Sequence, residues 1–598
     1  MFIGYSATFG EKAVRKNAVQ YVVVKICGTD KGELSCSKIF FDPIAMMVGS
    51  TFGCGCAEKT DKYLLADRFE RTTASICGWN SEGEYFHGGV SDEDKVTGMF
   101  YFNWLGQHPK EQSGIYDITK LSESNPEAIW DAQSKESPIN EYHFWGEPLY
   151  GYYNAADPWV IRKHIEMFIN SGIGFLGLDA TNAFLYEDVY ETLFSVIAEF
   201  RDQGFNYPRI CFLTNSSSRN TVFRLYELYY SKPEYNWLWF YRDGKPFIVL
   251  DKAEFDFRDP QITKITDKFS FRHVQWPYFP AYDEGFPWIS YDYPQYNHNG
   301  IMSVSVAQHT AGAMSRTGNQ GRGYDYISRQ NNSSLIATCS NYRAQWDTAI
   351  QTEDVGLVFL TGWNEWMALK LSDSGEHEVR YTDAFNYEFS RDIEPSLRED
   401  GDAYYLETVK RNQMFQTECT GVSALSRYAM TIDSDIDELY KNNKAMVYTD
   451  LRGDTALRDF AGAVESLHYT NNSGRNDIVS VGVSNDGKNM YILIECAEEI
   501  TPYMDDCWLN ILLRTGNSEY TINKQGLGVL SSETESVICE NVLQGNRFWI
   551  KIPFANLKDK GKTCALRVMD HVEEGVLGIY SQGDSAPLGN LFYEYKFG

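Results

Sequence analysis

Residues 173–179 read Ile-Gly-Phe-Leu-Gly-Leu-Asp, a short apolar run that ends in a carboxylate and predicts a buried β-strand. The segment before this run predicts a helix that begins at Asp157-Pro158, because Asp can cap a helix and Pro suits its first turn. Apolar residues then recur at helical spacing, and Gly172 supplies a stop. A second helix that ends at Gly204 and a strand at 209–214 follow. This alternation is typical of a parallel sheet covered by helices.

Further apolar runs extend the alternation through the middle of the chain. They lie at residues 97–103, 247–251, 269–276, 301–308 and 356–363, with a weaker run at 288–291. With the two strands above they make eight, so the predicted fold class is α/β, with a (β/α)8 TIM barrel over residues 97–445. No Gly-x-Gly-x-x-Gly follows the first strand and no P-loop pattern occurs, so the sequence predicts no nucleotide cofactor.

The last part of the chain has a different pattern. The runs at 477–483, 489–494 and 548–552 are short and are separated by Ser, Asn, Asp and Gly. Such short strands between turn residues predict a C-terminal β-sandwich over residues 446–598. Two roles are open for it, a structural cap or a carbohydrate-binding module, and the cap is favoured because no aromatic platform is evident in the sequence.

Composition narrows the classes of partner. The chain has 598 residues with 54 basic and 82 acidic side chains, a net charge of −28, so binding to nucleic acid is not expected. Aromatic residues reach 15%, with 40 Tyr and 14 Trp. Aromatic rings suit the flat faces of sugars, although a large β-rich protein would also be rich in them. The 12 Cys lack zinc-finger spacing and no loop motif supports calcium, so no metal site is predicted.

The N-terminal region predicts export. Residues 38–56 combine a Lys, an apolar stretch and small residues before Cys54, a pattern that resembles a bacterial lipoprotein signal with cleavage after Gly53. Asp42-Pro43 interrupts this stretch and residues 1–37 precede it, so we expect residues 1–56 to be a leader whose start lies too far upstream. The alternative is a buried element in an ordinary extension. On the leader hypothesis the chain is a periplasmic or cell-surface lipoprotein of a Gram-negative bacterium, attached to the membrane only through its lipid. Residues 57–96 are then an N-terminal extension of the barrel.

Polar and aromatic residues follow the predicted barrel strands. They are Asn103-Trp104, Asp179–Asn182, Thr214-Asn215, Asp251, Gln275-Trp276, Gln308-His309 and Trp363–Trp366. The active site of a barrel lies at the carboxyl ends of its strands, so these side chains are expected to share one mouth. Carboxylates beside Trp are what glycosidic cleavage requires, because one carboxyl protonates the leaving oxygen, a second acts as base or nucleophile, and rings hold the sugar.

Three motifs carry a family resemblance. The sequences at 356–366 (Gly-Leu-Val-Phe-Leu-Thr-Gly-Trp-Asn-Glu-Trp), 145–153 and 178–182 resemble the family 99 endo-α-mannosidases and the related WbsX-type domains of bacterial polysaccharide loci. The resemblance covers roughly residues 97–410 and extends to secreted proteins of gut Bacteroidetes. It implies that Glu365 matches the family's first motif Glu, which assists the sugar 2-hydroxyl. The second Glu, the acid/base, falls at Ala368, which cannot transfer a proton.

The catalytic residues expected from these patterns are Glu365 and Asp179. Asp179 is the first choice for the missing acid, and its alternative role is to anchor the turn at Thr181-Asn182. The residues expected to bind substrate are Trp104, Glu147, Tyr153, Asn182, Trp276, His298, Gln308, His309, Trp363, Asn364 and Trp366. Among these, Glu147 has the alternative of a salt bridge to the scaffold, and His309 that of a structural histidine. The charged stretch 389–395 predicts a buried ion-pair network.

The function predicted is a glycoside hydrolase that acts on a polysaccharide or glycan with carboxylate acid/base catalysis and no cofactor. A glycan-binding protein of the same fold is the alternative that Ala368 allows. A WbsX-like glycosyltransferase is a third, which an exported location disfavours because activated sugar nucleotides are cytosolic.

Overall fold

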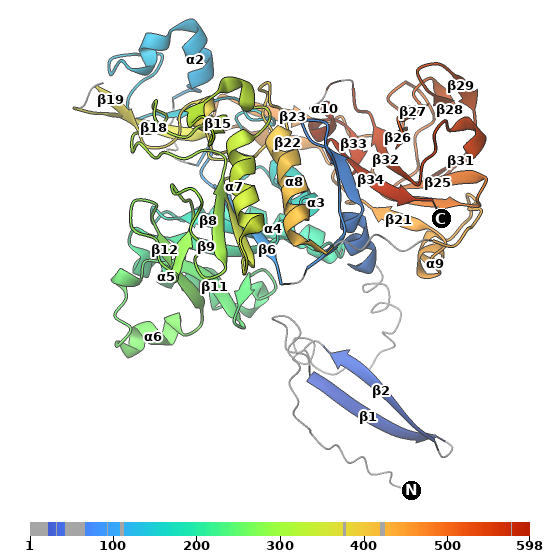
Figure 1. Ribbon diagram of the computed structural model, residues 1–598, viewed down its shortest axis with the longest axis horizontal. Helices are drawn as coiled ribbons and strands as arrows, with labels where there is room; N and C mark the ends of the chain where they lie inside the picture. The colour runs from blue at the N-terminus through green and yellow to red at the C-terminus, as the bar shows by residue number, and fades with distance from the viewer. Residues whose placement is uncertain are drawn as a thin grey trace.

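The computed structural model describes residues 22–30, 33–41, 66–92, 94–107, 113–374, 378–418, 425–573, 575 and 577–597. A barrel with surrounding helices forms one part of the molecule, and a β-sandwich packs beside it (Figure 1). Strands β1 (Val22–Asp30) and β2 (Glu33–Phe41) form a two-stranded sheet of their own. Cys54 and most of the predicted leader lie outside the described residues. No helix in the described part of the chain is both long and apolar enough to cross a membrane.

Eight parallel strands form the barrel. In spatial order they are β13 (Gly285–Pro287), β12 (Ser270–Gln275), β11 (Lys245–Leu250), β9 (Arg209–Thr214), β8 (Phe175–Ala180), β6 (Val96–Tyr101), β17 (Leu357–Thr361) and β14 (Ile301–Ser305). The two ends of this path, β13 and β14, contact each other, so the sheet nearly closes. The predicted TIM barrel is therefore confirmed. Its weakest strand was misplaced by a few residues, because Gly285-Phe286-Pro287 carries turn residues and the ring-rich run at 288–291 only follows it.

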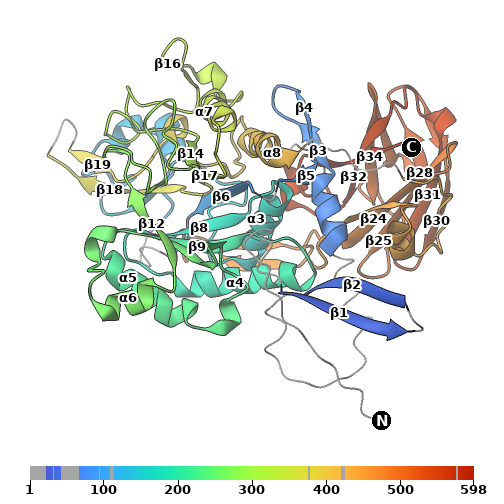
Figure 2. The same ribbon diagram turned by 60° about the horizontal axis from the view of Figure 1, so that its bottom comes forward.

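Helices pack around the barrel as the alternation predicts (Figures 1 and 2). They are α3 (Pro158–Asn170), α4 (Glu187–Asp202), α5 (Ser218–Leu225), α6 (Pro260–Thr266), α7 (Ser340–Gln351) and α8 (Ala403–Gln416). Helix α3 begins where the sequence predicts, since the Asp157 carboxylate accepts the Trp159 N–H at 3.0 Å. A small antiparallel sheet of β19 (Val379–Tyr381), β18 (Met367–Ser372) and β7 (Tyr142–Phe144) continues from the end of β17.

Two antiparallel sheets make up the C-terminal sandwich. One contains β21 (Met446–Thr449), β24 (Ile478–Asn485), β25 (Asn489–Cys496), β31 (Arg547–Pro553) and β30 (Glu540–Gln544). The other contains β29 (Ser536–Ile538), β28 (Gly526–Ser531), β27 (Ser518–Asn523), β26 (Asn510–Thr515), β32 (Thr563–Asp570), β34 (Leu591–Lys596), β3 (Ile76–Trp79) and β4 (Tyr85–His87), with β33 (Asp584–Ala586) beside β32. Buried residues of both sheets share one apolar core, so the sheets pack face to face.

The segment that precedes the barrel belongs to the sandwich. Strand β3 pairs with β34, and Ile76 lies opposite Tyr593. The sandwich is thus completed by a strand from the other end of the chain, which no local sequence pattern announces.

Barrel and sandwich share a buried junction. The Arg458 guanidinium donates to the Asp157 carboxylate that caps α3, at 2.8 Å, and the Tyr580 hydroxyl donates to Asp402 at 2.6 Å. The apolar core is also continuous across this junction. The two parts therefore rest on each other over a buried surface rather than meeting only through a linker.

Candidate active site

The segment after β17 fixes the position of the central carboxylate, Glu365. The Asn364 amide bonds to both backbone groups of Phe102, accepting from its N–H at 2.9 Å and donating to its carbonyl at 3.1 Å. This double contact ties the end of β17 to the end of β6. The neighbouring Glu365 is thereby held at the carboxyl end of the barrel, where barrel active sites lie.

Glu365 sits in a nearly buried charged group, with 8% of its side chain exposed. It forms an ion pair with Arg391, and its backbone N–H donates to the Asp392 carboxylate. Burial raises the pKa of Glu365 well above its usual range, Arg391 opposes this shift, and the charge of Asp383 adds to it. Burial likewise raises the pKa of Asp392 to about 7.

Asp383 brings a second carboxylate to Glu365. It follows β19, its Oδ2 accepts from the Thr382 hydroxyl at 3.0 Å, and its Oδ1 lies 3.8 Å from the Arg391 guanidinium. A hydrogen-bonding contact joins it to Glu365, and burial raises its pKa. Its side chain is 28% exposed, so it is more open to solvent than Glu365. Two carboxylates this close favour retention of a proton between them, and the charge of Arg391 opposes that effect.

Asp179 occupies the end of the neighbouring strand β8. Its Oδ1 accepts the Thr181 N–H at 2.9 Å, which is the turn-anchoring role that the sequence left open. Burial raises the pKa of Asp179, the Thr181 contacts oppose the shift, and the charge of Asp383 reinforces it. Asp179 and Asp383 therefore act on each other across the same mouth.

Aromatic side chains lie close to this group, since the Arg391 guanidinium sits over the Trp288 ring at 5.5 Å and the charge of Asp383 acts on Tyr142. Trp104 meets Tyr142 edge-on at 5.4 Å between ring centroids, and Trp276 meets Trp288 in the same way at 5.4 Å. Further out, exposed rings follow β8 and β12. They are Phe184, Tyr278 and Phe279, with exposed fractions of 51%, 58% and 67%. These rings lie on loops at the carboxyl ends of the strands and offer surfaces on which a sugar can stack.

His309 lies beside the charged group and is uncharged. Burial, with the positive charge of Arg391, lowers its pKa to about 3. Neither ring nitrogen has a hydrogen-bond partner among the described residues. This leaves one donor and one acceptor next to Arg391.

Several residues expected to bind substrate belong instead to the core. They are Tyr153, Gln308, Trp363, Asn364 and Trp366. Trp366 stacks on Trp145 at 4.3 Å, and Trp363 packs against Phe168 of α3 at 4.6 Å. These are corrections to the sequence prediction, which had no means of telling which side chains after a strand point to the mouth and which point into the helical layer.

Two other predicted ligands have contacts elsewhere, and a third is exposed at the barrel rim. Glu147 pairs with Lys120 at 2.7 Å, the salt-bridge alternative that the sequence left open. His298 precedes β14, so it lies at the opposite end of the barrel, where its ring contacts the Tyr282 carbonyl at 2.7 Å. Asn182 is exposed on the loop after β8. Asp179, Trp104, Trp276, His309 and Glu365 remain as the predicted residues at the mouth.

Asp383 and Arg391 are the site residues that the sequence did not assign. Asp383 follows a short hairpin strand rather than a barrel strand, so the rule of strand ends does not find it. Arg391 falls in the charged stretch 389–395, and the structure does contain a buried network there: Glu394 accepts from the hydroxyl of Tyr153 at 3.0 Å and contacts His164 at 2.8 Å. The density of charged residues in this stretch was the sequence feature that could have indicated Arg391.

A cavity of about 460 Å³ opens at the same end of the molecule. It is lined by Gln107, Asn154, Ala156, Pro158, Asp188, Thr192, Phe460 and Ala461. Pro158 and Asp188 start helices α3 and α4, while Phe460 belongs to β22 (Arg458–Ala461). The cavity therefore lies between the barrel rim and the segment that leads into the sandwich, and Glu365, Asp383, Asp179 and Arg391 are not among its lining residues.

Comparison with known proteins found similar solved structures. No protein-family model and no curated protein matches the chain. Among solved structures, the chain is similar to the GH99 endo-alpha-mannosidase from Bacteroides thetaiotaomicron. The identity is 16% and the TM-score 0.32, over 54% of this chain and 97% of that one. For a structure of the same enzyme in complex with bis-tris-propane, the identity is 15% and the TM-score 0.32, over the same fractions of the two chains. These neighbours belong to the family that the motif at 356–366 resembles, and the roles of individual residues here rest on the contacts described above.

Proposed function

We propose that the chain hydrolyses glycosidic bonds at the barrel mouth. The observation that carries this proposal is the pair of carboxylates Glu365 and Asp383 at Arg391, with Asp179 close enough to Asp383 to feel its charge. Burial raises the pKa of all three carboxyls, which favours an acid that keeps its proton, while Arg391 favours the charged form of Glu365. An acid and a charged carboxylate are what this reaction needs.

The arginine separates the roles of the carboxylates. Glu365 is paired with Arg391 and serves as the charged partner, acting on the sugar 2-hydroxyl, the anomeric carbon or a water. Asp179 has no cation against it in the described structure and its pKa is raised, so it serves as the acid. Asp383 is a second candidate for the acid, because its side chain is the most solvent-open of the three.

A screen of glycans tests this function. Wild-type protein incubated with a panel of polysaccharides and N-glycans is expected to release reducing ends from at least one of them. Glu365→Gln protein, purified in parallel, controls for contaminating hydrolases. Release that is equal in both preparations, or none in either, would contradict the proposal.

Glycan binding without cleavage is the second candidate. It is favoured by two observations: Glu365 is largely closed off from solvent, and Ala368 lies buried at the position of the family's second Glu. The exposed rings Phe184, Tyr278 and Phe279 would then form the binding surface. Retention of a glycan on immobilised wild-type protein with no released product would select this candidate.

A further inference from the structure

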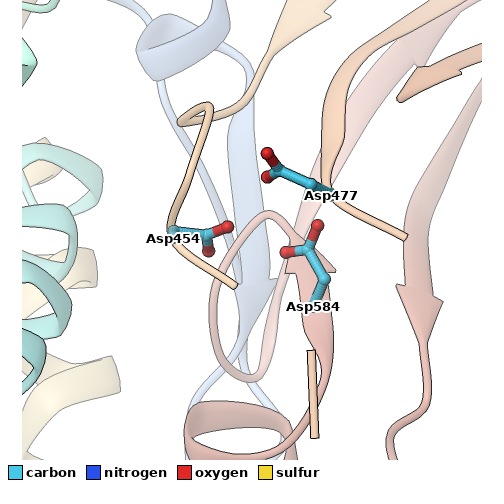
Figure 3. Close-up of side chains that lie close together, drawn as sticks. All are labelled: Asp454, Asp477 and Asp584. Carbon is cyan, nitrogen blue, oxygen red and sulfur yellow. The ribbon is translucent and has the colours of Figure 1, made fainter. Parts of the chain in front are cut away.

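Three aspartates converge at the junction of barrel and sandwich, far along the chain from one another. Asp454 follows β21, Asp477 precedes β24 and Asp584 begins β33. One carboxylate oxygen from each lies within 4.8 Å of the other two. Figure 3 shows the three side chains pointing toward a common centre.

The hydrogen bonds around this cluster leave some carboxylate oxygens without a partner. Asp454 Oδ2 accepts from Lys163 at 2.9 Å, and Asp584 Oδ2 accepts the Ile478 N–H at 2.6 Å. The other oxygen of each, Oδ1 in both, is buried and has no hydrogen-bond partner. Asp454 and Asp584 are each only 1% exposed, so water does not serve these oxygens freely. A buried carboxylate oxygen without a partner is costly and requires an explanation.

Two more buried carboxylates add to the same charge. Glu166 of α3 and Asp450 are 3% and 6% exposed, and both carry oxygens without a partner. Their charges act on the cluster: Glu166 interacts with Asp454, and Asp450 with Asp454 and Asp584.

The basic side chains nearby do not balance this charge. Among the described residues, Lys163 makes the one ion pair within this cluster, with Asp454. Arg162, which also acts on Glu166, pairs with Glu199 at 2.9 Å. Five carboxylates thus face Lys163, with Arg162 acting on Glu166 and Arg452 on Asp477, and a bound cation of charge two would reduce the excess of negative charge.

We propose that Asp454, Asp477 and Asp584 bind a Ca²⁺ ion that joins three segments of the sandwich beside helix α3 of the barrel. The donors are all oxygens, the set that Ca²⁺ and Mg²⁺ prefer. The three oxygens lie within the span that two ligands of one Ca²⁺ can have, about 4.8 Å at a metal–oxygen distance of about 2.4 Å. Ca²⁺ also tolerates irregular ligand geometry, whereas Mg²⁺ demands a near-ideal octahedron. Asp477 is only half-buried and gives an entry route.

This site lay beyond the sequence prediction, which included no metal. Its ligands come from three separate segments, at 454, 477 and 584, rather than from one loop motif. The inference does not depend on the proposed hydrolase, because the cluster lies at the junction and not at the barrel mouth.

Calcium binding to the full-length protein tests the site. Protein stripped with EGTA and dialysed is expected to take up one Ca²⁺ per chain by elemental analysis. Its unfolding temperature should rise by on the order of 5 °C at Ca²⁺ well above the dissociation constant, and by less with equal Mg²⁺. Asp454→Asn and Asp477→Asn should lose both effects. Asp505→Asn, which removes a sandwich carboxylate paired with Arg475, is the matched control and should keep them.

The order of stability of wild type and Asp477→Asn should depend on Ca²⁺, which makes the test specific. Without Ca²⁺, Asp477→Asn should be at least as stable as wild type, because it removes repulsion among buried carboxylates; with Ca²⁺, it should be less stable. Wild type that binds no Ca²⁺ after stripping, or an Asp454→Asn variant that responds to Ca²⁺ as wild type does, would overturn the proposal. An equal response to Mg²⁺ would overturn the choice of Ca²⁺.

Discussion

At the scale of residues, Asp179 and Asp383 are the two candidates for the catalytic acid. Asp179 caps its own turn, since its Oδ1 accepts the Thr181 N–H. Asp383 instead shares Arg391 with Glu365. An acid must be protonated to donate, so hydrolysis is expected to fall as pH rises through the raised pKa of the residue that serves.

Replacement of Asp179 or Asp383 by asparagine shows which of the two residues is the acid. Asp179→Asn should lower hydrolysis of natural glycans by about 10²–10⁴-fold, the usual contribution of a positioned acid. Substrates with activated leaving groups should recover most of this loss, because they need no protonation. Asp383→Asn should shift the alkaline limb of the pH profile while retaining most activity. If activated substrates restored the activity of Asp383→Asn but not that of Asp179→Asn, Asp383 would be the acid instead.

Residue-level sequence reasoning proposed Glu365 and Asp179 because both follow apolar barrel strands, and their roles stay predictions. It failed for Trp363, Asn364 and Trp366, which the sequence places beside Glu365 but which the fold turns into the core. Adjacency along a loop does not reveal the direction of a side chain, which depends on packing against α3 and β7. Asp383 was missed because it reaches the mouth from a hairpin.

At the scale of elements, Asn364 holds the ends of β17 and β6 together. Asn364→Ala should leave the Phe102 N–H and carbonyl unpaired and buried, at a cost of about 2–4 kcal/mol. Asn182→Ala, at an exposed loop position, should change stability by no more than about 0.5 kcal/mol. Urea unfolding followed by tryptophan fluorescence compares the two midpoints. Equal midpoints would show that the contact does not hold these strands.

The barrel strands were predictable because each is a continuous apolar run between helices, as parallel strands buried on both faces must be. Strand β13 was harder to place, since its three residues include Gly and Pro. The pairing of β3 with β34 lay out of reach, because strand pairing between the two ends of a chain has no local pattern.

At the scale of the whole molecule, the division into an extension (57–96), a barrel (97–445) and a sandwich (446–598) stands as a proposal that the structure refines. Residues of β3 and β4 join the sandwich, and helix α9 (Ile436–Lys441) packs with Val447 and Trp549 in a satellite core. We therefore propose that the structural unit of the sandwich begins before residue 446 and includes the β3–β4 hairpin.

Export also belongs to this scale and remains a proposal from the sequence. If Cys54 is lipidated, expression in a Gram-negative host should give a mature chain that lacks residues 1–53 and carries a lipid on its first residue. Mass spectrometry of the membrane fraction reads this directly, and Cys54→Ser should abolish the processing. An intact, unlipidated N-terminus in the cytoplasm would contradict it.

The most direct test of the account as a whole is the hydrolysis rate of Glu365→Gln. The amide keeps the shape of the side chain and can still bond to Arg391, while the carboxylate charge is lost. On a glycan that the wild type cleaves, the rate is predicted to fall by about 10²–10⁴-fold or more, with glycan affinity held within about tenfold. Full activity in Glu365→Gln would contradict the assignment of the barrel mouth as a glycosidase site.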